Sequence, residues 1–273
     1  MEFRSLLFVP GNNPRFVAKS RTARADAVCL DLEDSVPAAE KQEARRAVRE
    51  ALGGRFEGAA LVRTNSPGSG MMEDDLRAAC GPGLDGVVIP KVDAAREVDA
   101  ARRLMDSLGC GAPVLPSIES ALGVVNAFGI ASCGGTSALV FGVFDLLHDM
   151  GSEYEGGGSA AYARSKVPVD ARAAGRYAID SVWQDVRDPG GLADDCRRGR
   201  SMGYLGKCAI HPDQLPAIHG GFAPSEGQLA LAREVRDAYE ASAASGRGAT
   251  TVRGRMIDEV HYKQAVRLLG PQG

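Results

Sequence analysis

Several features that mark other classes of protein are missing from this sequence of 273 residues. No apolar run approaches the roughly 20 residues that a membrane-spanning helix needs. Met1 leads directly into the strand-like stretch from Ser5 to Val9, without the basic flank, long apolar region and cleavage site of a signal peptide. These absences argue against a membrane protein, and we expect a cytoplasmic one.

An excess of positive charge is also missing. The formal net charge is -3, and residues of both signs are interspersed along the chain. Nucleic acids and acidic membrane surfaces are bound by basic faces or polybasic segments, so we expect neither as a partner. A polyanionic ligand would need its own local site.

The six cysteines include no C-x-x-C pair, a spacing typical of zinc and redox sites. Cys29 and Cys208 lie within apolar, strand-like runs, so we interpret the cysteines as buried, reduced thiols. The sequence also has no nucleophile elbow around a serine or cysteine and no lysine-bearing phosphate loop. Serine or cysteine acyl-enzyme chemistry and nucleotide hydrolysis are therefore not indicated.

What the sequence does contain is a repeated pattern of a short apolar run followed by a helical stretch. The runs are nearly continuous, as expected for parallel strands covered on both faces. Eight occur, namely Ser5 to Val9, Ala27 to Leu32, Ala59 to Arg63, Gly86 to Pro90, Pro113 to Ile118, Ala138 to Val143, Ala178 to Trp183 and Tyr204 to Ile210. Eight units in roughly 220 residues predict a (β/α)8 TIM barrel. A doubly wound sheet is the alternative, but no Gly-x-Gly-x-x-Gly turn follows the first run.

The clearest of the intervening helices is predicted from about Ala38 to Leu52. Ser35 offers a cap, Pro37 lies near the first turn, and Gly53 with Gly54 ends the helix. This helix lies between the second and third apolar runs, as the alternation of strand and helix requires.

Two regions depart from this alternation. Gly151 to Ala161, with glycines at 156, 157 and 158, is expected to form a loop after the sixth run, either a lid or a passive linker. Near the C-terminus, a helix from Glu226 to Ser245, a Gly/Arg/Thr-rich turn and a final helix near His261 to Leu269 form an extension. We therefore predict a barrel domain over 1–223 and a C-terminal helical extension over 224–273.

Polar side chains gather where the apolar runs end, which is the catalytic face of a TIM barrel. In chain order these ends are Asp31-Leu32-Glu33-Asp34, Arg63-Thr64-Asn65, Pro90-Lys91, Glu119-Ser120, Asp145 and His211-Pro212. We expect these groups to converge on one mouth.

Glu119 and Asp145 end neighbouring strands of the predicted barrel, so their backbones would lie roughly 5 Å apart. Two unpaired carboxylates at that distance repel each other, and a cation between them removes the repulsion. A pair of hard oxygen ligands suits Mg²⁺, which keeps waters and accepts substrate oxygens. The alternative is that each carboxylate caps a helix or pairs with Arg63 or Lys91.

Asp31 and Glu33 alternate with leucines and so point to one face of the second strand. They could hold metal-bound waters, orient Lys91 or form purely structural ion pairs. Arg63 offers a planar group suited to a carboxylate or to a developing enolate oxygen. Among the histidines, a structural turn is favoured over a catalytic base for His211, and the other three are expected to be structural or exposed.

Several motifs occur together and in order along the chain. They are Arg4-Ser5-Leu6-Leu7-Phe8-Val9-Pro10-Gly11, Asp31-Leu32-Glu33-Asp34-Ser35, Val62-Arg63-Thr64-Asn65, Pro90-Lys91, Ile118-Glu119-Ser120, Gly142 to Leu146, Tyr162-Ala163-Arg164-Ser165, Ile210-His211-Pro212 and Gly254-Arg255-Met256-Ile257-Asp258. Over nearly the whole chain the sequence resembles the citrate lyase β-subunit and malyl-CoA lyase family.

This resemblance implies a barrel that binds Mg²⁺ through Glu119 and Asp145, with an α-keto or α-hydroxy acid chelating the metal. Arg63 would contact substrate oxygens, and Lys19 would lie near the phosphates of coenzyme A. Asp258, delivered by the tail of a neighbouring subunit, would take part in proton transfer within a homotrimer or hexamer. Without the resemblance, Asp258 would be expected to cap the final helix.

Two departures from the family pattern concern the acyl carrier. Many members that use coenzyme A have Arg where this chain has Asn13, and the glycines at 156–158 replace a loop that is often basic. The expected function is reversible cleavage of a thioester into an acyl-CoA, or an acyl group on another carrier, and a small α-keto acid. The alternatives are a thioesterase and a non-catalytic binding subunit.

Overall fold

The computed structural model describes residues 2–154 and 160–270. The chain divides into two compact units, Met1–Phe222 and Ala223–Gly273. The glycines at 156–158, for which a lid or linker was expected, lie outside the described residues. In the described ranges, the structure has no helix that is both long and apolar enough to cross a membrane.

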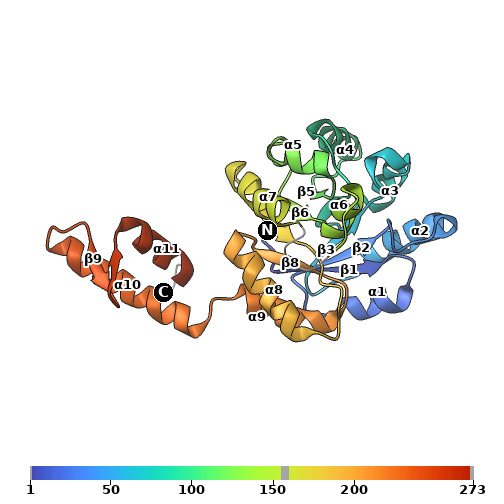
Figure 1. The fold of residues 1–273 in the computed structure, drawn as a ribbon. Coiled ribbons are helices and arrows are strands. Elements are labelled where there is room, and N and C mark those ends of the chain that lie inside the picture. The colour runs from blue at the N-terminus through green and yellow to red at the C-terminus, as the bar shows by residue number, and fades with distance from the viewer. Residues whose placement is uncertain (1, 155–159, 271–273) are drawn as a thin grey trace. The chain divides into compact units, whose positions relative to one another are not determined.

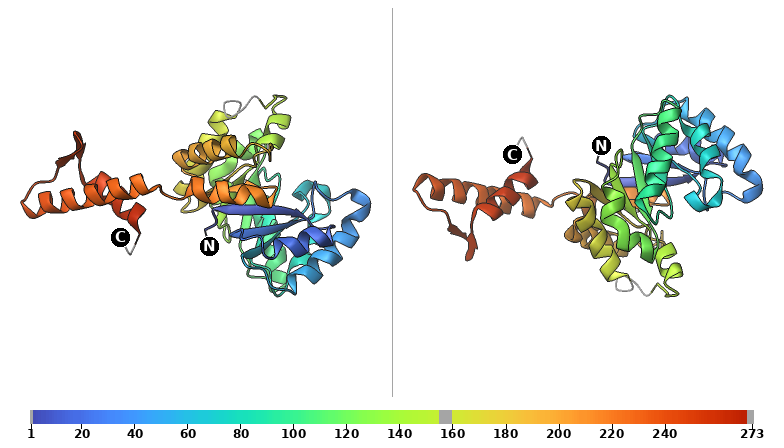
Figure 2. Two further views of the ribbon diagram at one scale, coloured as in Figure 1. Left: turned by 90° about the horizontal axis from the view of Figure 1, so that it is seen from below. Right: turned by 90° about the horizontal axis from the view of Figure 1, so that it is seen from above.

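The first unit is a closed barrel of eight parallel strands with helices around it (Figures 1 and 2). The strands are β1 (Ser5–Pro10), β2 (Ala27–Asp31), β3 (Ala59–Arg63), β4 (Gly86–Ile89), β5 (Val114–Ile118), β6 (Ala138–Phe141), β7 (Tyr177–Asp180) and β8 (Gly206–Ala209). The helices are α1 (Pro14–Ser20), α2 (Lys41–Leu52), α3 (Met72–Ala79), α4 (Ala95–Ser107), α5 (Ala121–Ala131), α6 (Val143–Asp149), α7 (Ala161–Ala173), α8 (Pro189–Met202) and α9 (Leu215–Phe222). The predicted (β/α)8 barrel is confirmed, and the open-sheet alternative is wrong.

Successive strand residues face two different cores. Leu6 packs inside the barrel with Cys29 and Cys208, whereas Leu7 and Val9 pack against the surrounding helices. Because both faces are covered, the strands carry the continuous apolar runs seen in the sequence. Cys29, Cys133, Cys196 and Cys208 are buried free thiols, as predicted, whereas Cys80 and Cys110 are only partly buried. Burial raises the pKa of Cys29 and of Cys208.

The helix predicted from Ala38 to Leu52 differs from the structure at its start. A short 3-10 turn, Ala38–Glu40, precedes α2, which begins at Lys41. Ser35 does not cap this helix, because α2 begins only at Lys41, beyond the reach of the Ser35 side chain. The Ser35 hydroxyl instead donates to the Asp31 carboxylate. The end is as predicted, since the N–H of Gly53 donates to the Glu50 carbonyl at 3.1 Å.

The second unit contains α10 (Glu226–Ala244), β9 (Thr250–Val252), β10 (Arg255–Ile257) and α11 (Glu259–Leu269). The segment predicted as a Gly/Arg/Thr-rich turn is therefore a β-hairpin (Figure 2). Arg253 and Gly254 form its two-residue turn with φ of 49° and 76°, the combination that matches the twist of paired strands. The β-branched residues before this Arg-Gly pair were the signal that our prediction did not use.

Candidate active site

A cavity of about 340 Å³ opens at the C-terminal ends of the barrel strands. Its polar lining residues are Asp31, Ser35, Arg63, Ser117, Glu119, Asp145 and Ser181, and its apolar lining includes Phe8, Val140, Phe141 and Val182. Most of the polar strand ends named from the sequence therefore meet at one mouth. His211 is not among the residues that line this cavity.

Arg63, the last residue of β3, is held by two carboxylates from the end of β2. Its Nε and Nη2 donate to Asp31 at 2.6 and 2.7 Å, and its Nη1 lies 3.1 Å from Glu33 Oε2. Its guanidinium also lies 4.8 Å from the centre of the Phe8 ring. Burial alone would raise the pKa of Asp31, but the hydrogen bonds and charge of Arg63 hold that pKa below its ordinary value. Of the roles left open for Asp31, the structure shows the ion pair.

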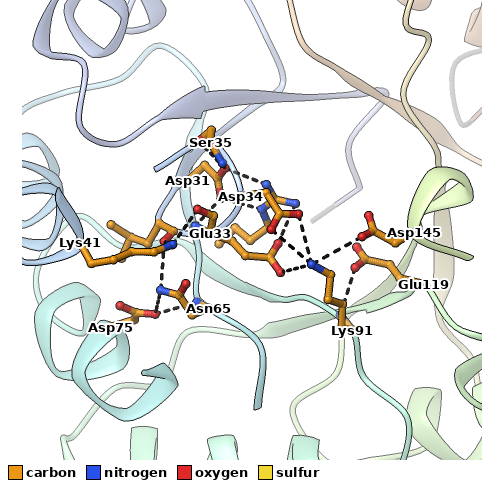
Figure 3. Close-up of polar contacts among 12 residues, drawn as sticks. Asp31, Glu33, Asp34, Ser35, Lys41, Asn65, Asp75, Lys91, Glu119 and Asp145 are labelled. Atoms are coloured by element: carbon orange, nitrogen blue, oxygen red, sulfur yellow. Dashed lines mark hydrogen bonds and ion pairs between the residues drawn. The ribbon is translucent and has the colours of Figure 1, made fainter. Parts of the chain in front are cut away.

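Lys91 contacts four carboxylates of the site (Figure 3). Its Nζ lies 2.9 Å from Glu33, 3.2 Å from Asp34 and 3.5 Å from Asp145. Its backbone N–H donates to Glu119 Oε2 at 3.2 Å. Lys91 has a φ of 53°, which is uncommon for a residue other than glycine and costs conformational energy. This conformation lets the backbone and the side chain of one residue reach different carboxylates.

Glu119 follows β5 and is 6% exposed. Burial raises the pKa of its carboxyl group to about 8, and the charges of Glu33 and Asp145 act in the same direction. Gly142 makes room for this side chain, because a Cβ at that position would lie 2.4 Å from Glu119 Cγ. A cation beside this carboxylate would favour its ionised form.

Asp145 does not end a strand, so that part of the prediction is wrong. Strand β6 ends at Phe141, the chain turns at Gly142, and Asp145 lies in the first turn of α6. A helix N-terminus favours a negative charge, which suits an ionised carboxylate here. Ser181 Oγ accepts the N–H of Val143 at 3.0 Å and so fixes the start of this helix, a contact that the sequence did not indicate.

Glu119 and Asp145 nevertheless line the same cavity. Within residues 2–154 and 160–270, no group of three or more His, Cys, Asp or Glu side chains is arranged to hold a metal ion. A cation at this pair would therefore take its other ligands from water or substrate. Mg²⁺ commonly binds in this way, using one or two protein carboxylates and keeping several waters. The two carboxylates fit Mg²⁺. The contacts of Lys91 with Glu119 and Asp145 correspond to the alternative named from the sequence, in which these carboxylates pair with a neighbouring basic residue.

Lys19 lies beside a second cavity of about 430 Å³, close to Phe16. The two cavities adjoin, because they share the lining residues Phe8, Val9, Pro10 and Ile210. Asn13, the position where many relatives were expected to have Arg, caps α1 by accepting the N–H of Phe16 at 3.1 Å. The residue that departs from the family pattern thus has a structural role here.

Asp258 is the N-cap of α11 in the second unit. Its Oδ1 accepts the N–H of Val260 at 3.0 Å and lies 2.6 Å from His261 Nδ1. The hydrogen bond with His261 holds the pKa of Asp258 below its ordinary value. The structure shows the capping role named above as the alternative, and proton transfer by Asp258 stays a prediction.

Two of the barrel histidines that the structure describes, His211 and His219, have structural contacts, and a third, His148 of α6, is exposed. His211 caps a short 3-10 turn, and its Nδ1 accepts the N–H of Asp213 at 3.2 Å. His219 Nε2 lies 2.8 Å from the hydroxyl of Ser5. Both agree with the structural interpretation favoured from the sequence.

A buried group of four charged residues was not predicted. Arg164 of α7 pairs with Asp180 of β7 and Asp195 of α8. Lys207 of β8 lies 3.0 and 2.7 Å from the same two carboxylates. The group joins two strands to two helices next to Ser181, and separations this large along the chain carry no local sequence signal.

The family model of the HpcH/HpaI aldolase/citrate lyase family matches residues 4–212, which include all eight strands of the barrel and the residues of its mouth. The chain belongs to this family. The resemblance identified from the sequence motifs is thereby confirmed.

Relatives with related names match nearly the whole chain. A citrate lyase subunit beta-like protein of Deinococcus radiodurans is 37% identical and covers 97% of this chain and 96% of that protein. A (3S)-malyl-CoA thioesterase of Cereibacter sphaeroides is 34% identical, with coverage of 98% and 93%. The structure of CitE from Mycobacterium tuberculosis in complex with magnesium, acetoacetate and coenzyme A has a TM-score of 0.85 at 31% identity, with coverage of 98% and 97%. The family is enzymatic, and its named members differ in the bond they break.

Proposed function

We propose that this chain is a Mg²⁺-dependent carbon-carbon lyase. It would cleave or form a β-hydroxyacyl-CoA thioester of the malyl-, citramalyl- or citryl-CoA type, giving an acyl-CoA such as acetyl-CoA and an α-keto acid. The observation that carries this proposal is the convergence of Glu119, Asp145 and Arg63 on one cavity. The CitE complex with magnesium, acetoacetate and coenzyme A supports it, because that protein shares the fold at 31% identity.

The contacts of the mouth residues support the roles that we propose for them. Held by Glu119 and Asp145, Mg²⁺ would supply Lewis acidity at the C2 oxygen of the keto-acid half. Arg63 is fixed by Asp31 and would stabilise the negative charge that develops on substrate oxygens. Because that guanidinium is already oriented in the free protein, little reorganisation is needed when the charge appears.

Proton exchange at the α-carbon of the thioester is assigned to Asp258 from the tail of a neighbouring subunit, in a homotrimer or hexamer. A general base is most effective when its pKa lies near the working pH. The cap contacts of Asp258 lower its pKa, so we expect this carboxylate to leave His261 when it acts.

The second cavity supports a nucleotide-bearing acyl carrier. It adjoins the mouth and includes Lys19, a cation that could contact a phosphate of coenzyme A. Because Asn13 is a helix cap and supplies no positive charge, one phosphate contact expected from the family is missing. Weak binding of free coenzyme A relative to a carrier-bound acyl group would be consistent with this difference.

Thioester hydrolysis is the second candidate, favoured by the 34% identity to a (3S)-malyl-CoA thioesterase. A non-catalytic subunit that only binds a keto acid or acyl group is a third possibility. Incubating the purified chain with malyl-, citramalyl- and citryl-CoA, and following both keto acid and free thiol, separates them. A lyase releases keto acid without thiol, a thioesterase releases thiol, and a binding subunit releases neither.

A further inference from the structure

The side chain of Lys41 binds two backbone carbonyls in the turn that follows β2. This residue begins α2 and is 8% exposed. Its Nζ donates to the carbonyl oxygen of Leu32 at 2.6 Å and to that of Glu33 at 2.7 Å (Figure 3). The contacts join the first turn of a helix to the segment that carries the acidic residues of the mouth.

The position of Lys41 is unfavourable for a lysine in two respects. Burial removes hydration from its ammonium group, and the first turn of a helix repels a positive charge. Charge-assisted hydrogen bonds to two carbonyl oxygens offset these costs. The contacts with the turn therefore explain why a lysine lies here, because a lysine at this position does not stabilise α2 itself.

Asn65 and Asp75 hold the same turn through a second set of contacts. Asn65 Nδ2 donates to the Leu32 carbonyl at 3.0 Å and to Asp75 Oδ2 at 2.7 Å. Asp75 is fully buried and also accepts from Arg45 Nε at 2.7 Å. Two donors thus meet at the Leu32 carbonyl, which fixes the orientation of the peptide before Glu33.

The side chain of Glu33 connects this turn to the mouth. One carboxylate oxygen lies 3.1 Å from Arg63 Nη1 and the other lies 2.9 Å from Lys91 Nζ. We propose that Lys41 is a positioning residue of the active site, which orients the Glu33 carboxylate, and through it Arg63 and Lys91, by holding two backbone carbonyls. Its kinetic consequence rests on the proposed function, whereas its structural consequence does not.

Two substitutions and a matched control test this role. Lys41→Met keeps a long apolar stem but loses the donor, and Lys41→Arg restores donors. Arg49 is the control because it lies on the same helix and also donates to backbone carbonyls, those of Ala78 and Arg77. Arg49→Met therefore breaks the same kind of contact without touching the turn after β2.

Crystal structures of the variants give a readout that needs no activity. In Lys41→Met we expect the Glu33 carboxylate to move so that its distances to Arg63 Nη1 and Lys91 Nζ exceed about 4 Å, the limit of an ion pair. In Lys41→Arg and Arg49→Met these contacts should stay as they are. A Glu33 side chain that keeps both contacts in Lys41→Met would overturn the proposal.

Kinetics supply the second readout. If the wild type is an active lyase, Lys41→Met should lower kcat/KM at least about tenfold, mainly through kcat, with Lys41→Arg close to wild type. Combined with Glu33→Gln, Lys41→Met should add less than its single effect, because both changes remove the same orientation. Equal losses in Lys41→Met and Arg49→Met, or fully additive effects, would refute the positioning role. An inactive wild type would instead refute the proposed function. The crystal structures would then test the positioning role of Lys41 by themselves.

Discussion

The backbone N–H of Lys91 donates to the Glu119 carboxylate at 3.2 Å, and Lys91 adopts a φ of 53° where it makes this bond. A single neutral donor does not compensate a buried negative charge, so the pKa of Glu119 stays raised to about 8 by burial and by nearby carboxylates. Asp145 lines the same cavity. The pair is therefore expected to bind a cation.

Glu119→Gln tests this expectation. The neutral amide removes the cost of burying a charge, so the Tm without metal should equal or exceed that of the wild type. The rise in Tm on adding Mg²⁺ should disappear, and activity should fall at least about 100-fold. Thermal unfolding with and without Mg²⁺ measures the first effect. Full activity after exhaustive chelation would show that no metal is needed.

Arg63→Lys keeps the positive charge but loses the planar group that pairs with Asp31 at two points. We expect a loss of kcat of about 100-fold or more with little change in fold. Arg4→Lys is the matched control, because Arg4 pairs in the same way with Asp26 at the opposite end of the barrel. Steady-state kinetics of both variants measure the difference, and near wild-type turnover in Arg63→Lys would make that arginine structural only.

Asp258→Asn separates capping from proton transfer. Asn caps helices about as well as Asp, so the stability of the second unit should be retained while activity is lost. If the tail acts on a neighbouring subunit, mixing this variant with Glu119→Ala should restore activity, because some sites then contain both intact residues. Activity is measured after subunit exchange has been verified. Exchange without recovery of turnover would count against shared sites, and a fully active monomer would exclude them.

The lowered pKa of Asp195 makes the free energy of unfolding depend on pH. Burial would raise its pKa, but hydrogen bonds from Arg164 and the charge of Lys207 hold the pKa below its ordinary value. Because the folded-state pKa is the lower one, this stabilisation is complete above the unfolded pKa of about 3.9 and is lost as the pH falls through the folded pKa. Asp195→Asn should lower the free energy of unfolding at neutral pH by about 3 kcal/mol and weaken the loss of stability in acid.

Urea unfolding across the acidic and neutral range measures both effects. Asp194→Asn is the control, because Asp194 lies beside Asp195 in the sequence but pairs with Arg197 at the surface. It should change the free energy of unfolding by no more than about 0.5 kcal/mol. An acid transition identical in the wild type and Asp195→Asn would contradict this account.

The sequence predicted the barrel because strands covered on both faces must be apolar throughout, as Leu6 and Leu7 show by packing into different cores. It also predicted most of the mouth, because Arg63 is the last residue of β3 and Glu119 comes directly after β5. Asp145 was assigned to a strand end because only Gly142 separates β6 from α6, so the apolar run continues from the strand into the helix. The left-handed conformation of Lys91 has no sequence signal, since most lysines avoid it.

Contacts between distant segments were missed for a different reason. Lys41 looks like an ordinary surface lysine of an amphipathic helix until its carbonyl partners after β2 are placed. Ser35 is a good capping residue by type, but the 3-10 turn Ala38–Glu40 shifts the start of α2 to Lys41, beyond its reach. For Lys41 a tertiary partner overrides the local preference, and a local pattern does not contain that partner.

The most direct test of the proposed lyase activity follows the coenzyme A species formed from citramalyl-, malyl- and citryl-CoA by the purified chain, with Mg²⁺ and after chelation. With at least one of these substrates, we expect an acyl-CoA and an α-keto acid to form in equal amounts. We expect chelation to stop the formation of both products, and Glu119→Gln to form neither. Free coenzyme A as the main product, or product formation that continues undiminished without metal, would contradict it.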